Sequence, residues 1–61
     1  MNTETETAKR YRRHAEELRT IAADKQAKDN RQALLRLALD YERMADTMDA
    51  IAQTDRTMRM R

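Results

Sequence analysis

His14 and Glu17 come closest, by residue type and spacing, to a site for chemistry. Residues three apart on a helix share a face, so an imidazole and a carboxylate at this spacing can ligate one metal ion. Helical bundles that bind two metal ions use the reverse order, Glu-x-x-His, together with further inward glutamates. This chain has a single His, and its second predicted helix carries no inward carboxylate. We therefore expect no metal and no cofactor.

Nucleophilic catalysis requires a hydroxyl, thiol or amine that is held beside a base. The chain has no Ser and no Cys, and no Thr, Lys or Tyr stands beside a plausible base. The lack of Cys also fits a reducing compartment. No apolar run reaches the length of a signal peptide or a membrane span. We expect a protein that is not an enzyme, lies in the cytoplasm and does not bind membranes.

Basic side chains gather near both ends of the chain, and phosphate binding requires such cations on a rigid frame. The formal net charge is only +2, because eleven acidic residues are interspersed among thirteen basic ones. We expect Arg12 and Glu42, for example, to pair across the two helices. A nucleic-acid-binding dimer is therefore the alternative hypothesis. Its candidate contacts are Lys9, Arg10, Arg13, Arg56, Arg59 and Arg61.

The composition predicts an all-α fold. The 61 residues include no Gly and no Pro, the two strongest helix breakers, and are rich in good helix formers. Thr3 and Glu6 have the spacing of a capping box, and Asp29 is a second candidate N-cap, three residues before Gln32. These signals predict helices over about 4–25 and 30–54. We expect one domain over 1–61, with frayed ends at 1–3 and about 57–61.

The phase of the apolar residues predicts that the two helices fold into an antiparallel hairpin. Both helices show heptad spacing, but an unbroken helix at roughly 100° per residue would point the two stripes about 120° apart. A turn near Gln26–Lys28 removes this conflict. Each layer of the hairpin then pairs one small side chain with one large one, which favours dense packing. The expected layers are Ala22 with Leu34, Leu18 with Ala38, Ala15 with Tyr41, Tyr11 with Ala45, and Ala8 with Met48.

A further apolar row lies beside this seam and predicts self-association. A single core in so short a chain rarely supplies enough stability, and oligomerisation is a common remedy. We expect a homodimer that forms an antiparallel four-helix bundle. Its interface is expected to contain His14, Ile21, Leu37, Met44 and Ile51. Leu35 and Leu39 fall on the opposite edge, where two Leu one turn apart suit the docking of another protein.

The stretch from Tyr11 to Ala45 resembles short bacterial proteins of unknown function. Their chains read Arg-x-x-Ala-Glu-Glu-Leu-Arg, then, after a gap, Arg-x-x-Leu-Leu-x-Leu-Ala-x-x-Tyr-Glu-x-Met/Leu-Ala. The resemblance implies a small cytoplasmic helical hairpin and carries over no activity. From the residues themselves, we expect a regulator or adaptor that acts through self-association and protein–protein contacts.

Overall fold

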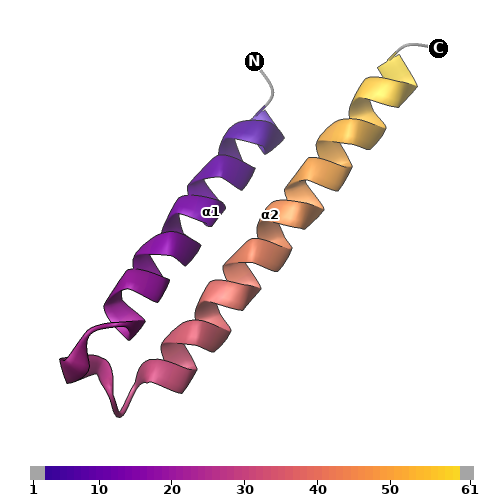
Figure 1. Ribbon diagram of the computed structural model, residues 1–61. Helices are drawn as coiled ribbons and strands as arrows, with labels where there is room; N and C mark the ends of the chain where they lie inside the picture. The colour runs from indigo at the N-terminus through magenta and orange to yellow at the C-terminus, as the bar shows by residue number, and fades with distance from the viewer. Residues whose placement is uncertain (1–2, 60–61) are drawn as a thin grey trace.

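The chain forms a hairpin of two helices joined by a short turn, as predicted (Figure 1). The computed structural model describes residues 3–59, with side chains through residue 58. Helix α1 covers Thr3–Ala22, the single 3-10 turn η1 covers Lys25–Ala27, and α2 covers Arg31–Arg59. The two helices pack side by side along a rod whose Cα atoms span 52 × 17 × 10 Å. Thr3 and Arg59 therefore lie at the same end, opposite the turn.

Helix α1 ends at Ala22, three residues before the predicted boundary, because Asp24 starts the turn. The backbone of Asp24 is extended, at φ −70° and ψ 142°, and its side chain accepts a hydrogen bond from the Gln26 N–H. An Asp side chain that bonds the backbone two residues later stabilises a turn in competition with the helix. No positive-φ residue occurs in the described chain, so the turn needs no Gly.

Helix α2 starts at Arg31, one residue later than expected from the predicted N-cap, Asp29. The carbonyl of Asn30 accepts the N–H of Leu34, so Asn30, and not Asp29, supplies the first intrahelical bond. The start is tied to the end of α1 by Arg31. Its Nε donates to the Ala22 carbonyl at 2.7 Å, and its Nη2 donates to the Asp24 carbonyl at 3.3 Å.

Alanine forms the whole of the buried core. Every buried residue among those described is an alanine, and no large side chain is fully buried. The large partners in the predicted layers, such as Tyr11 and Tyr41, are only half-buried. Each predicted layer therefore contains one buried alanine and one half-buried large residue, which agrees with the small-to-large alternation. The buried residues are Ala8, Ala15, Ala22, Ala27, Ala38, Ala45 and Ala52.

Candidate interaction surface

Ion pairs join the two helices along one edge of the hairpin. Arg12 Nη2 lies 3.2 Å from Asp46 Oδ1 and 2.6 Å from Asp49 Oδ2. The hydrogen bond to Asp49 raises the pKa of Arg12 above its ordinary value, and Asp46 acts in the same direction. All three side chains remain substantially exposed, so we expect these pairs to fix register more than to supply stability.

The predicted pair of Arg12 with Glu42 is wrong, because Glu42 pairs with Arg19. Side chains on a helix lean toward its N-terminus, and Arg is longer than Asp or Glu. An Arg of α1 therefore reaches residues of α2 that lie further toward the C-terminus than those opposite its own Cα. Arg19 also pairs within α1, where its Nη1 lies 2.9 Å from Glu16 Oε1.

The opposite edge of the hairpin carries exposed aliphatic side chains, which we call the apolar row. At about 100° per residue, the carboxylates that pair with Arg12 and Arg19 lie about 40–100° to one side of the buried Ala45. The members of the row on α2 lie about 80–140° to the other side. The apolar row consists of Ile21 (52% exposed), Leu37 (44%), Met44 (39%), Ile51 (43%) and Met58 (70%).

His14 joins this edge through a stack of rings. Its imidazole lies 5.4 Å from the ring of Tyr41, and Tyr41 in turn lies 5.8 Å from the ring of Tyr11. Both pairs are tilted, at 35° and 43°, within the range of separations that favour aromatic contact. Sequence reasoning placed Tyr11 and Tyr41 in adjacent layers but did not predict that their rings touch. The five predicted interface residues are all exposed in the single chain.

Grooves run along the apolar row. A hollow of about 700 Å³ lies at the turn, between Ile21 and Leu37. Two further hollows, of about 450 and 430 Å³, border Met58 near the end of α2. Met44 borders a smaller one of about 230 Å³. Hollows therefore border the row at the turn, beside Met44 and near the end of α2.

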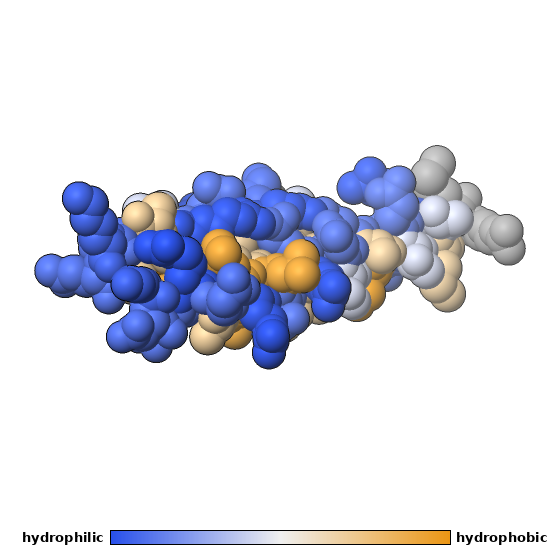
Figure 2. Space-filling view, turned by 60° about the horizontal axis from the view of Figure 1, so that its bottom comes forward, coloured by the Kyte–Doolittle hydropathy of each residue, from blue (hydrophilic) through white to orange (hydrophobic). Residues whose placement is uncertain are grey.

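Figure 2 shows one face of the rod, on which strongly hydrophobic side chains gather midway along its length with hydrophilic atoms around them. Leu35 and Leu39, the predicted partner patch, are 41% and 47% exposed. At about 100° per residue they lie on the same side of α2 as the ion-paired carboxylates. The hairpin thus exposes aliphatic side chains at two separate places, on opposite edges.

Among the described residues, the predicted nucleic-acid contacts lie in the half of the rod opposite the turn. Lys9 pairs weakly with Glu6 at 3.9 Å, whereas Arg10, Arg13 and Arg56 are exposed. The side chains of Arg59 and Arg61 lie outside the described residues. The structure thus brings Arg10 and Arg13 of α1 and Arg56 of α2 to the same half of the rod. The carboxylates that pair with Arg12 lie in the same half.

The described residues contain no group of three His, Cys, Asp or Glu side chains arranged to hold a metal ion. His14 and Glu17 are both exposed. Neither helix in the described part of the chain is apolar enough over a sufficient length to cross a bilayer. The fold and its surface define a small all-α helical hairpin. No family model, no curated protein and no solved structure matches the chain.

Proposed function

We propose that this helical hairpin is a non-enzymatic protein that self-associates as a homodimer and acts through protein–protein contacts, as a regulator or adaptor. The observation that carries the proposal is the pairing of an alanine-only core with an exposed apolar row on one edge. Burial of an Ile, Leu or Met side chain contributes roughly 1.5–3 kcal/mol. The single chain leaves about half of that stabilisation unused, and an antiparallel four-helix bundle recovers it in both copies.

The exposed area supports the same proposal. A compact monomer of 7.2 kDa exposes about 4,100 Å² by the usual scaling with mass. This chain exposes 5205 Å², roughly 1,100 Å² more. A standard interface covers about 800 Å² on each partner. An interface of that size would therefore cover most of the surface that the hairpin exposes in excess.

Leu35 and Leu39 supply the contact for a different protein. Their edge is separate from the apolar row, so it stays accessible when the row is covered. A twofold dimer presents this patch twice, which raises the avidity for any partner that carries two copies of its own site. The cytoplasmic location expected from the composition remains a prediction.

Replacement of Met44 by Glu tests the self-association. Two carboxylates would enter an apolar interface close to its symmetry axis, and such burial is strongly unfavourable. We expect the Met44→Glu protein to sediment as a monomer and to lose most of its helicity, because short helices without tertiary contacts are marginal in water. The wild-type protein should sediment as a dimer, with an unfolding temperature that rises with protein concentration.

Leu39→Glu is the matched control, since it places the same charge on an equally exposed aliphatic position of the other edge. It should leave the dimer intact and weaken the capture of a partner from a lysate relative to the wild type. A wild-type protein that is monomeric at all concentrations, or a Met44→Glu dimer with full helicity, contradicts the proposal.

A further inference from the structure

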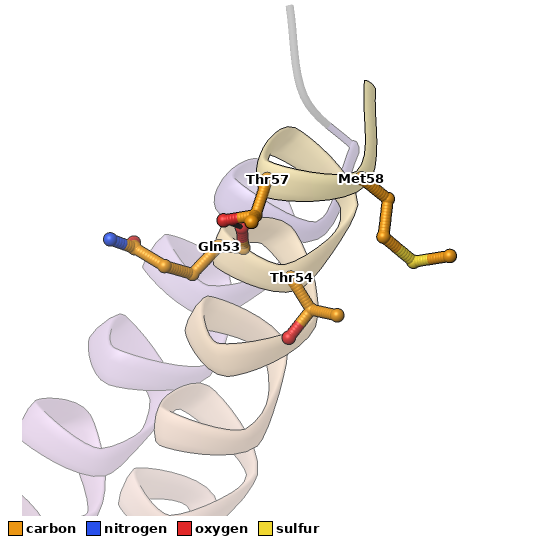
Figure 3. A pocket seen from close by; sticks show the side chains of 4 residues that line it. All are labelled: Gln53, Thr54, Thr57 and Met58. Atoms are coloured by element: carbon orange, nitrogen blue, oxygen red, sulfur yellow. Dashed lines mark hydrogen bonds between the residues drawn. The ribbon is translucent and has the colours of Figure 1, made fainter. Parts of the chain in front are cut away.

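Met58 is the most exposed of the large apolar side chains that the structure describes, at 70%. The layers of the seam pair Ala8 with Met48, so the first residue of α1, Thr3, lies level with about Gln53 at equal rise along the two helices. Met58 therefore stands beyond the end of α1, and its side chain extends away from both helices (Figure 3). The described residues of its own chain leave most of this side chain uncovered.

A hollow lies at the opposite end of the same row. It has a volume of about 700 Å³ and is lined by Ile21, Ala27, Asn30, Leu34 and Leu37, among others. Three of these residues are large aliphatic ones that the single chain leaves half-buried or exposed. The hollow is open to solvent and has room for a flexible thioether side chain, which adapts readily to irregular gaps.

The projection and the hollow are placed symmetrically about Met44. Met58 follows Met44 by fourteen residues and Asn30 precedes it by fourteen, a displacement of about 21 Å in each direction along the helix. Leu37 and Ile51 are likewise seven residues to either side. A twofold axis through Met44 exchanges each member of these pairs with the other, so the surface is complementary to itself.

We infer that a second copy of this chain covers the apolar row in the antiparallel direction, about a twofold axis at Met44, and that Met58 of each copy fills the hollow at the turn of the other. This inference rests on the proposed self-association and adds its geometry. The interface then contains Met44 against Met44 at the axis and Leu37 against Ile51 on both sides. The partner that the surface fits is a second hairpin of the same sequence.

A twofold arrangement that packs α2 against α1 of the second copy leaves the projection uncovered. With the axis parallel to the helices, α2 packs against α1 of the second copy and both turns lie at the same end. Ile51 then meets Thr5, which is the residue of α1 at its level, and Met58 lies beyond the end of both copies of α1. The antiparallel arrangement is favoured because it buries every aliphatic member of the row against another apolar surface.

Two threonines on the flank of the row cost little to desolvate. Thr47 and Thr54 line the hollow beside Ile51 and Met58. Their hydroxyls already donate to backbone carbonyls of their own helix, at 3.0 Å in each case. A polar group that keeps its hydrogen bond can be removed from water without the full penalty of an unmet one. This flank is therefore suited to burial under a partner helix.

Chemical cross-linking tests the arrangement, and the absence of native Cys permits single-cysteine variants. A short bismaleimide is applied to Met44→Cys, to Met58→Cys, and to an equal mixture of Asn30→Cys and Met58→Cys, after sedimentation has established the mass of each. We expect Met44→Cys to cross-link to itself. The mixture should give a covalent dimer in several-fold higher yield than either of its components alone.

The outcomes separate the geometry from the self-association itself. A dimer in which Met58→Cys cross-links efficiently to itself has its two turns at the same end, which overturns the inference and leaves the proposed function standing. A dimer in which neither Met44→Cys nor the mixture reacts also overturns the inference alone. A wild-type chain that sediments as a monomer overturns both.

Discussion

Arg31 Nε donates a hydrogen bond of 2.7 Å to the carbonyl oxygen of Ala22, and this contact closes the turn. The last carbonyls of a helix have no partner within it, and a cation near them also interacts favourably with the helix dipole. Arg31 is the first residue of α2, so a single side chain caps the end of α1 and fixes where α2 begins. The contact is partly buried, which strengthens it.

Replacement of Arg31 by Ala should destabilise the hairpin by about 1.5–3 kcal/mol, the usual contribution of a hydrogen bond made by a charged group. Urea unfolding followed by circular dichroism measures the change. Arg36→Ala is the control, because Arg36 is exposed on the same helix, and it should shift stability by less than about 0.5 kcal/mol. Equal effects of the two substitutions would show that the cap contributes nothing specific.

Enlargement of a seam residue should force the helices apart. Ala15 has no exposed surface, and nothing larger than a methyl group fits where it faces α2 without movement of the backbone. We expect Ala15→Leu to destabilise the hairpin by about 1–3 kcal/mol, as overpacking of a dense core does. Thermal unfolding gives the value. Ala23→Leu, at an exposed position just past α1, should be nearly neutral, and a similar loss there would refute the role of the seam.

Replacement of Arg12 by Ala should lower stability slightly at low salt and hardly at all at high salt, because exposed ion pairs are screened. Its bond to Asp49 raises the pKa of Arg12, so the folded state holds this proton more tightly than the unfolded state. The contribution of the Arg12 proton is therefore present throughout the neutral range and is lost as pH rises into strong alkali. Melting curves of both proteins at two salt concentrations check this, and an unchanged difference at high salt would contradict it.

Nucleic-acid binding is expected to be absent at physiological salt. Arg12 and Arg19 form ion pairs with carboxylates of α2. The same carboxylates lie among the basic side chains that remain exposed, and they repel phosphate. Titration of labelled DNA and RNA at two salt concentrations measures the interaction, since phosphate binding weakens steeply as salt increases. Tight binding that Arg10→Ala and Arg13→Ala reduce together would instead favour the alternative of a nucleic-acid-binding dimer.

The hairpin could be predicted from the sequence because its determinants are local and periodic. The seven-residue recurrence of Ala8, Ala15 and Ala22 reveals the buried stripe, and the change of phase reveals the turn. The details of the turn could not be predicted in the same way. Arg31 reaches back nine residues to Ala22, and no periodicity signals that contact.

The edges of the hairpin were harder to predict than its seam. A methyl group contacts whatever lies directly opposite, so the layers follow from counting residues. A long side chain can instead pair with any of several carboxylates along the opposite helix. Arg12 pairs with Asp46 and Asp49, which lie further toward the C-terminus of α2 than Glu42. The exposed row was visible as a heptad, but the overhang of Met58 depends on the relative lengths of two helices.

The alanine core also determines when side-chain conformational entropy is lost. Alanine has no side-chain rotamers to restrict, so formation of the hairpin costs almost none of this entropy in its buried core. Met44 and Met58 are exposed in the single chain, and restriction of a methionine side chain costs up to roughly 1.5–2 kcal/mol. The conformational entropy of these side chains is therefore lost when two copies assemble and not when the single chain folds. Methyl groups of the seam should be rigid in both states, whereas those of the methionines should become rigid only when a second copy covers them.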